Sequence, residues 1–220
     1  MFGQNPKRSA IFNDGNELEV QSVFKTLQGE GLFVGTPSIF IRLGGCNLAC
    51  KFCDTDFEDF KLISVDEILK KVINLSDNLI KLIVITGGEP LRQPIELICF
   101  KLIDLGFTVQ IETNGTIYRP LPMEVYIICS PKAGSNGYSK IREDLLPHIS
   151  AIKFLVSANI TKYSLVSEVG QTDYKIPVFI QPMDQYDTSL NKQNMELALK
   201  LVFETGSRLS LQTHKFIGIE

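Results

Sequence analysis

Three cysteines lie close together in the stretch GGCNLACKFCDTDF, where Cys46, Cys50 and Cys53 have C-x3-C-x2-C spacing. Thiolates are the usual protein ligands of iron–sulfur clusters, and each iron of a [4Fe–4S] cluster needs a ligand beyond the cluster's own sulfides. Three cysteines therefore predict a cluster in which the fourth iron is open. An open iron can bind a small molecule, so the spacing indicates a reactive cluster rather than one that only stores an electron.

Other uses of the three thiols have less support. A structural zinc site takes four Cys or His ligands, whereas Cys99 and Cys129 lie in apolar runs typical of buried side chains. Neither His148 nor His214 stands at the spacing of a zinc finger. A disulfide would leave one cysteine of the triplet over, and nothing marks the chain as secreted. Zinc and redox-active thiols remain the alternatives.

Length and composition narrow the class of protein. The 220 residues suit one domain with a sizeable core, and we expect a flexible N-terminal extension over 1–16 followed by a single domain over 17–220. The net charge is −3 without a basic block, so no direct nucleic-acid partner is expected. No apolar run reaches the length of a membrane span, and the polar N-terminus lacks a signal-peptide pattern. We therefore expect a cytoplasmic, reducing location, which an oxygen-sensitive cluster would need.

Apolar strand-like runs alternate with helical patterns along the chain. We expect strands at 18–24, 38–43, 81–86, 107–113, 125–130, 152–156, 177–181 and 208–213. We expect helices from 65 behind a Ser64–Glu67 capping box, over 91–105 up to Gly106, over 191–205 up to Gly206, and a shorter one within 160–170. This alternation predicts an α/β fold with a mostly parallel sheet, flat or curved toward a barrel.

That architecture would bring the polar motifs to one rim, because ligand sites in such sheets gather at the carboxyl ends of the strands. Polar or glycine-rich residues follow six of the expected strands. They are Cys46 after the second strand, Gly87 to Pro90, Asn114 with Gly115, Pro131 with Lys132, Pro182 and His214.

The residues at these positions also resemble a known family. The cysteine motif followed by TGGEP at 86–90 is similar to the radical S-adenosylmethionine enzymes. Within them, FKTLQGEG (24–31), CDTDF (53–57), ETNG (112–115) and LQTHKFIGIE (211–220) resemble the 7-carboxy-7-deazaguanine synthase family. The resemblance runs from about Leu18 to the end of the chain. It implies a shortened, TIM-like partial (β/α) barrel, a homodimer, and an electron donor such as flavodoxin or ferredoxin.

The resemblance further implies a radical ring contraction. In the family, 6-carboxy-5,6,7,8-tetrahydropterin becomes 7-carboxy-7-deazaguanine with loss of ammonia, on the route to queuosine and other deazapurines. The reduced cluster cleaves S-adenosylmethionine to a 5′-deoxyadenosyl radical, which takes hydrogen from C6 of the substrate. No side chain is then catalytic in its own right, because the cofactor supplies the radical.

Roles for individual residues follow from the same resemblance. The cofactor would lie against the backbone of Gly87 and Gly88, where side chains would block its approach. Thr55 would bind Mg²⁺ through its hydroxyl and so join the metal to the substrate carboxylate, unless it only caps the next turn. The residues implied in binding S-adenosylmethionine are Gly87, Gly88, Glu89, Glu112, Asn114, Ser130, Lys132 and Gln181.

The implied substrate contacts come from both ends of the chain. Gln28 and Glu30 would hydrogen-bond the amide and amine edge of a pterin, and Arg42 would bind its carboxylate. The remaining implied contacts are Thr86, Gly88, His214 and the terminal carboxylate of Glu220. The plainer alternatives are a solvated turn for Gln28 and Glu30, an internal ion pair for Arg42 and a surface histidine for His214. His148 matches no role and is expected to be structural.

Two other functions stay open. A glycyl-radical activase shares the cysteine motif but acts on a protein chain and has no need of LQGEG, Thr55 or the QTHK tail. A zinc-stabilised interaction module would use the cysteines without catalysis.

Overall fold

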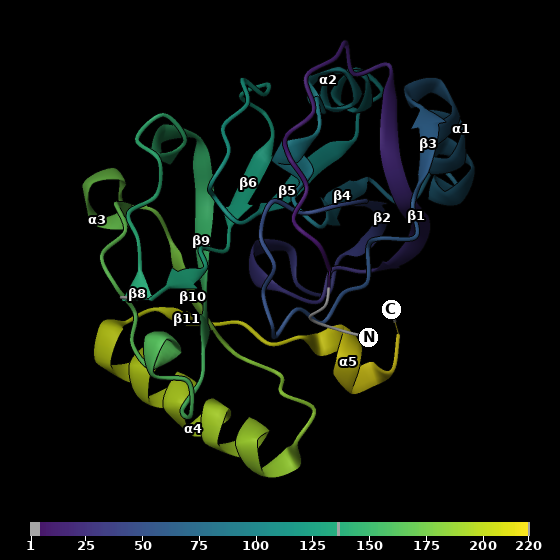
Figure 1. Ribbon diagram of the computed structural model, residues 1–220. Coiled ribbons are helices and arrows are strands. Elements are labelled where there is room, and N and C mark those ends of the chain that lie inside the picture. Colours follow the sequence, from purple (N-terminus) through teal and green to yellow (C-terminus); the bar gives the residue numbers. More distant parts are fainter. Residues whose placement is uncertain (1–4, 136, 220) are drawn as a thin grey trace.

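A single mixed sheet organises the molecule in the computed structural model, which describes residues 5–135 and 137–219 (Figure 1). Over these residues nine strands pair in the order β11-β10-β9-β6-β5-β4-β2-β1-β3. The strands are β1 (Glu17–Leu27), β2 (Pro37–Leu43), β3 (Lys61–Ser64), β4 (Leu82–Gly87), β5 (Thr108–Thr113), β6 (Tyr126–Cys129), β9 (Ile149–Val156), β10 (Val178–Pro182) and β11 (Arg208–Leu209). A separate pair joins β7 (Ala133–Gly134) to β8 (Gly137–Tyr138).

The central strands are parallel, as the sequence predicts. Every neighbouring pair from β2 to β11 runs in the same direction, whereas β1 is antiparallel to both β2 and β3. The sheet order begins at β3 and ends at β11, and the pairings among the described residues do not close it into a ring. A mostly parallel α/β sheet is therefore confirmed.

The core lies where apolar strands meet the helices. Ile83 and Ile85 on β4 are fully buried, as expected of a central parallel strand. The first helix, α1 (Val65–Ser76), packs on β1, β2 and β3. The Ser64 hydroxyl accepts a hydrogen bond from the Glu67 N–H at 3.3 Å, so the predicted N-cap is present.

The next helix starts later than the sequence pattern predicts. In place of a helix over 91–105, a 3₁₀ turn covers Pro90–Arg92 and α2 spans Glu96–Asp104. The interruption has a local cause, because Gln93 precedes Pro94 and is extended (φ −104°, ψ 153°), as residues before proline tend to be. Gly106 has a positive φ of 79° immediately after the helix, as expected of a C-terminal glycine.

Helix α4 (Thr188–Thr205) begins three residues before the predicted start at 191. The Asp187 carboxylate caps it by accepting a hydrogen bond from the Leu190 N–H at 2.9 Å. It packs on β9, β10 and β11 and ends at Gly206, which is left-handed. Among the described residues, no helix combines the length and apolar character needed to cross a membrane.

Short elements differ most from the sequence-based prediction. β3 was not predicted. The expected strand over 208–213 stops at Leu209, and Thr213–Ile217 forms a short helix, α5. Within 160–170 only the 3₁₀ turn Thr161–Tyr163 forms, followed by the four-residue α3 (Gln171–Tyr174). Further 3₁₀ turns cover Gly31–Phe33 and Leu146–His148.

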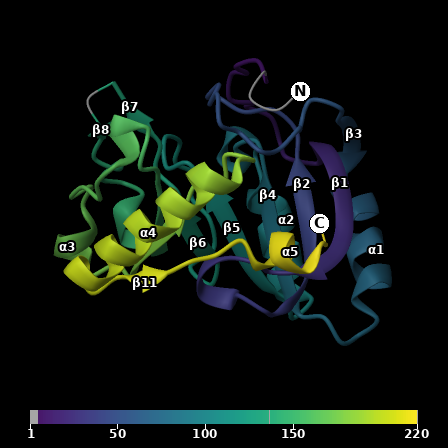
Figure 2. The same ribbon diagram turned by 90° about the horizontal axis from the view of Figure 1, so that it is seen from below.

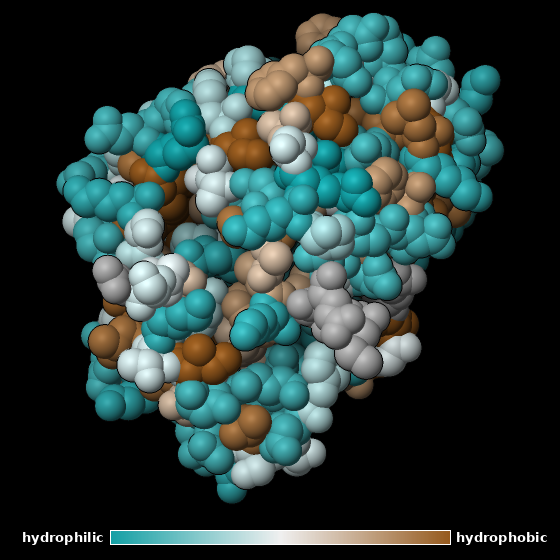
Figure 3. Space-filling view, in the orientation of Figure 1, coloured by the Kyte–Doolittle hydropathy of each residue, from teal (hydrophilic) through white to brown (hydrophobic). Residues whose placement is uncertain are grey.

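Both ends of the chain pack against the sheet domain. The Arg8 N–H donates to the Cys46 carbonyl at 2.7 Å, and the Ile11 N–H donates to the Arg92 carbonyl at 2.7 Å. Residues 1–4 of the expected N-terminal extension lie outside the described residues. At the other end, the segment from β11 to α5 crosses to the neighbourhood of β1 and β2 (Figure 2). Hydrophilic side chains predominate on the face shown in Figure 3.

Candidate functional site

A cavity of about 270 Å³ lies at the carboxyl ends of the parallel strands. It collects nearly all of the residues that the sequence predicts for the site. Those that line it are Gln28, Glu30, Arg42, Cys46, Cys50, Cys53, Thr55, Thr86, Gly87, Gly88, Glu112, Asn114, Ser130, Lys132, Gln181 and His214. Their individual roles stay predictions, and Glu220 lies outside the described residues.

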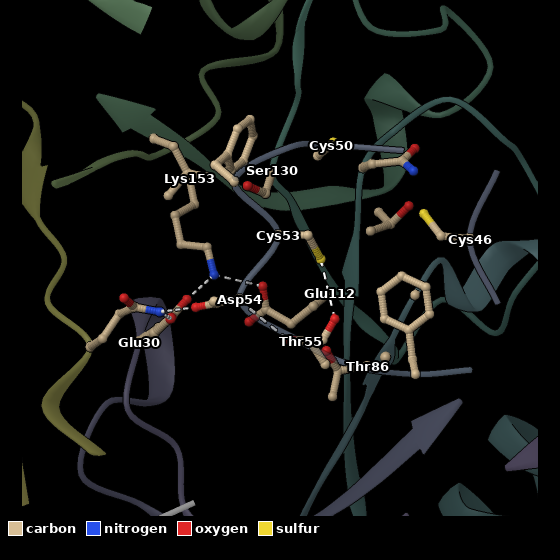
Figure 4. A pocket seen from close by; sticks show the side chains of 18 of the residues that line it. Glu30, Cys46, Cys50, Cys53, Asp54, Thr55, Thr86, Glu112, Ser130 and Lys153 are labelled. Atoms are coloured by element: carbon tan, nitrogen blue, oxygen red, sulfur yellow. Dashed lines mark hydrogen bonds and ion pairs between the residues drawn. The ribbon is translucent and has the colours of Figure 1, made fainter. Parts of the chain in front are cut away.

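The cysteine loop follows β2 and presents its thiols to this cavity (Figure 4). All three thiols are free and partly exposed. Burial raises the pKa of Cys46 to about 11, and it also raises those of Cys50 and Cys53. Lys132 opposes this shift at Cys50 and Cys53. The thiols are therefore protonated unless a metal replaces the proton, as ligation by iron would.

This donor set fits an iron–sulfur cluster. The cavity wall offers three soft thiols from one loop, and thiolate is the ligand that such clusters take. Within the ranges described, no three His, Cys, Asp or Glu side chains converge closely enough to hold one metal ion. A cluster needs no such convergence, because each thiolate binds a different iron. Cys46, Cys50 and Cys53 would thus hold the cluster, which would supply an iron open to a small-molecule ligand.

The two glycines of TGGEP are required by the protein's own packing. A Cβ on Gly88 would stand 2.0 Å from the Gly45 carbonyl oxygen, and one on Gly87 (φ +127°) would stand 2.0 Å from the Leu43 carbonyl oxygen. The family resemblance implies glycine at these positions because the cofactor would approach their backbone closely. The structure supplies a further reason, since their backbone must pass directly against the loop that begins the cysteine motif.

Glu89 lies behind the cavity wall and is fully buried. Its carboxylate accepts hydrogen bonds from the Thr113 hydroxyl and the Asn114 N–H, both at 2.7 Å, and from the Leu91 N–H at 3.0 Å. Burial raises its pKa, and these hydrogen bonds oppose the rise. Unlike the other predicted cofactor residues, Glu89 is not among the lining residues. It joins the end of β4 to the end of β5 and so fixes Asn114.

A buried lysine that sequence analysis missed lies on the opposite wall. Lys153 on β9 donates to the Glu30 carboxylate and, at 2.9 Å, to the Glu112 carboxylate (Figure 4). Burial alone would raise the pKa of Glu30, but Lys153 and the Gln212 amide bring it below its ordinary value. Burial raises the pKa of Glu112, and nearby Glu30 adds to the rise. The sequence did contain a signal for this ion pair, because a lysine within the apolar run SAIKFLV needs a buried partner.

The loop after β1 meets the C-terminal helix α5 at Gly29. A Cβ on Gly29 would stand 2.0 Å from Nδ1 of His214, so only glycine lets the imidazole lie there. The Thr213 N–H and hydroxyl both donate to the Gly29 carbonyl at 3.1 Å. His214 therefore reaches the cavity from α5 rather than from the end of a strand. Burial lowers its pKa, which favours the neutral imidazole.

Thr55 lines the cavity next to a charged cluster. Its hydroxyl donates to the Asp54 carboxylate at 3.2 Å. The other oxygen of Asp54 accepts from Lys215 at 2.9 Å and from Gln212 at 3.3 Å. These hydroxyl and carboxylate oxygens are the hard donors that Mg²⁺ prefers. The arrangement also ties the cysteine loop to the C-terminal segment, a contact that the sequence did not reveal.

Arg42 reaches the cavity from β2, with its guanidinium 5.0 Å from the centre of the Phe24 ring. An arginine at this place can offer a fork of N–H donors to a carboxylate in the cavity. Besides Lys153, five polar lining residues were not predicted from the sequence, namely Asn5, Asp54, Thr113, Asp184 and Gln212. The wall therefore combines thiols, carboxylates, amides and cations around one small space.

Comparison with known proteins identifies the family. The pattern of the radical SAM superfamily matches residues 40–127. The 7-carboxy-7-deazaguanine synthase of Rickettsia prowazekii is 68% identical over 225 residues, which cover 100% of this chain and 96% of that protein. The enzyme of the same name from Rhodospirillum rubrum is 37% identical, with 100% of both chains covered.

Solved structures agree with these relatives. The crystal structure of QueE from Escherichia coli matches with a TM-score of 0.72 at 28% identity, over 89% of this chain and 93% of that one. Streptococcus suis SuiB, bound to its precursor peptide SuiA, shares the fold alone, with a TM-score of 0.52 at 15% identity over 76% of this chain and 46% of that one. The chain thus belongs to the 7-carboxy-7-deazaguanine synthase family of radical S-adenosylmethionine enzymes.

Proposed function

We propose that the chain converts 6-carboxy-5,6,7,8-tetrahydropterin to 7-carboxy-7-deazaguanine with release of ammonia. The observation that carries this proposal is the shared cavity, in which the cluster cysteines face the same space as Glu30, Arg42 and His214. A group that generates a radical would thus stand beside groups that can recognise a pterin carboxylate and its amine edge. Family membership supports the same reaction.

The cofactor side of the cavity would hold the radical source. When bound there, the cluster and S-adenosylmethionine together supply a carbon-centred radical that can remove a hydrogen atom from a substrate. Cys46, Cys50 and Cys53 would hold the cluster. The side chains that would receive S-adenosylmethionine line the cavity at the ends of β5, β6 and β10, namely Glu112, Asn114, Ser130, Lys132 and Gln181.

The opposite side would orient the pterin. The Glu30 carboxylate can accept from the guanidine-like N–H pair, and the Gln28 amide can contact the neighbouring carbonyl edge. Arg42 can bind the substrate carboxylate with two N–H groups. His214 is mostly neutral at pH 7 because burial lowers its pKa, so it can donate one hydrogen bond without adding charge.

Further parts of the proposal concern the metal and the partners. Thr55 would supply one oxygen to a Mg²⁺ ion that also binds the substrate carboxylate, with water completing the shell. A one-electron donor such as flavodoxin or ferredoxin would reduce the cluster. We further propose a homodimer working in the cytoplasm.

An anaerobic assay tests the proposed reaction. Reconstituted protein would receive 6-carboxytetrahydropterin, S-adenosylmethionine, Mg²⁺ and a chemical reductant, and the product would be identified by mass. We expect 7-carboxy-7-deazaguanine and one ammonia per product. A reconstituted protein that cleaves S-adenosylmethionine but neither binds nor converts the pterin would reject the proposed substrate and favour an activase that acts on a protein chain.

A further inference from the structure

Lys153 has no role in the mechanism so far, yet it lies at the centre of the cavity wall. It belongs to β9, and its side chain is only 7% exposed. Its ammonium contacts Glu30 and Glu112 together, and Figure 4 shows it pointing between them. Glu30 follows β1 and Glu112 belongs to β5, so one ammonium bridges two distant parts of the sheet.

The two carboxylates belong to different halves of the site. Glu30 stands with the groups predicted to recognise the pterin, while Glu112 stands with those predicted to contact S-adenosylmethionine. Both are partly buried, with side chains 15% and 16% exposed. Two like charges at such a place repel each other, and a cation between them offsets the repulsion.

Each carboxylate has other hydrogen-bond partners, but these are neutral amides, which stabilise a negative charge less than an ammonium does. Glu30 also accepts from the Gln212 amide at 2.9 Å, and Glu112 from the Gln110 amide at 2.8 Å. Asp54 adds negative charge near Glu30. Further charged or titratable groups near the pair are Lys132 and Cys129 on the side of Glu112, and His214 on the side of Glu30.

We propose that Lys153 is a positioning residue for pterin binding: by bridging the Glu30 and Glu112 carboxylates, it holds Glu30 directed at the amine edge of the substrate. This inference rests on the proposed function. Removing the ammonium leaves Glu30 facing Glu112 without compensation. One of the two carboxyl groups would then bind a proton at a higher pH than in the native protein, and a protonated Glu30 could no longer accept from two N–H groups.

The pH dependence distinguishes this role from a purely structural one. In the native protein Lys153 helps to hold the pKa of Glu30 below its ordinary value, so Glu30 is ionised throughout the neutral range. Without Lys153 that pKa rises, and pterin binding should weaken progressively as the pH falls through the raised value. A lysine that only stabilised the fold would change stability without giving pterin binding a new pH dependence.

The experiment measures pterin binding by anaerobic calorimetry on the reconstituted protein between pH 7 and 8.5. The variants are Lys153→Met, Lys153→Arg and, as a matched control, Lys200→Met on the exposed face of α4. We expect Lys153→Met to raise the Kd for 6-carboxytetrahydropterin on the order of 10- to 100-fold at pH 7, with a smaller increase at pH 8.5. Lys153→Arg should bind within about fivefold of the native protein with a flat profile, and Lys200→Met should be unchanged.

Other results would overturn the inference. Lys153→Met binding the pterin with a native Kd and a flat profile would show that Lys153 does not act through Glu30. A loss in S-adenosylmethionine affinity larger than the loss in pterin affinity would place its action on the cofactor instead. If Lys153→Met does not fold, Lys153→Gln carries the same test, because its amide keeps a donor but no charge. Native protein that binds no pterin would instead reject the proposed substrate itself.

Discussion

The two walls of the cavity are built in different ways. On the cofactor side, the thiols and the TGGEP glycines follow β2 and β4, and Asn114 and Lys132 follow β5 and β6. Neighbouring parallel strands bring these positions together, and the Glu89 carboxylate then fixes Asn114. On the substrate side, Glu30 and Gln212 form a hydrogen bond although they are 182 residues apart. Gln212 and His214 belong to that wall only while α5 stays docked on the loop after β1.

Because the two walls are built differently, we expect radical generation and substrate recognition to be lost separately. Damage to the cofactor side should stop cleavage of S-adenosylmethionine and product formation together. Damage to the substrate side should stop product formation while reductive cleavage continues without productive turnover. Measuring 5′-deoxyadenosine and 7-carboxy-7-deazaguanine in the same reaction therefore tests whether the two walls are separate.

The largest effect is expected from Cys50→Ala, which removes one proposed cluster ligand. Cleavage and product formation should both fall by more than about 1,000-fold, because the cluster loses a corner. Cys99→Ala is the matched control, since Cys99 is fully buried in the core and far from the thiol loop in sequence. Iron content, visible absorbance and 5′-deoxyadenosine are measured after anaerobic reconstitution. Cleavage that persists in Cys50→Ala would refute the ligand assignment.

Gly29→Ala should damage the substrate wall alone. The new methyl group would overlap the His214 ring, so α5 or the 28–30 loop must shift. We expect the KM for the pterin to rise on the order of 10- to 100-fold while the cluster spectrum and reductive cleavage stay native. Gly134→Ala provides a control, because its Cβ would meet only the Gly137 carbonyl oxygen at 3.9 Å. Equal loss of cleavage and product formation in Gly29→Ala would show that the walls are not separate.

Thr55→Ala tests a residue of the cysteine loop that would also contact the substrate through Mg²⁺. The hydroxyl removed here is the proposed protein ligand of Mg²⁺, so the variant should keep its cluster but lose most of the activation by Mg²⁺. We expect about a tenfold fall in product formation at saturating Mg²⁺. A titration of activity with Mg²⁺, run beside the native protein, gives the comparison. Unchanged Mg²⁺ dependence would show that Thr55 is not the ligand.

How well the site could be predicted from the sequence differs between the same two walls. The cofactor side could be located from local motifs, because each motif directly follows a strand that its apolar run identifies. Lys153 was missed because its two partners come from distant elements, and nothing local specifies which carboxylates it meets. The segment from Ser210 to Thr213 was wrongly predicted to continue the last strand, since Leu209 to Thr213 contains no breaker and the docking of Thr213 on Gly29 decides its path.

The smallest effect is expected from replacing Lys215, whose ion pairs help to hold α5 in place. Lys215 donates to Asp54 and to Asp184, both at 2.9 Å, and its own side chain is 30% exposed. Because solvent screens the pair, Lys215→Met should reduce the free energy of unfolding by only about 1 kcal/mol at pH 7. Lys200→Met, which breaks an exposed pair with Glu204, should cost less than about 0.5 kcal/mol.

The pH dependence of this loss identifies its cause. Burial alone would raise the pKa values of Asp54 and Asp184, but Lys215 and their hydrogen bonds lower both. Their contribution to stability is therefore complete above the ordinary aspartate pKa of about 3.9 and is lost as the pH falls through the lower folded values. Denaturant unfolding of cluster-free protein should show the gap between Lys215→Met and native protein narrowing below about pH 4. A gap that stays constant would mean that Lys215 stabilises α5 through the packing of its alkyl chain, so the substrate wall would not depend on these ion pairs.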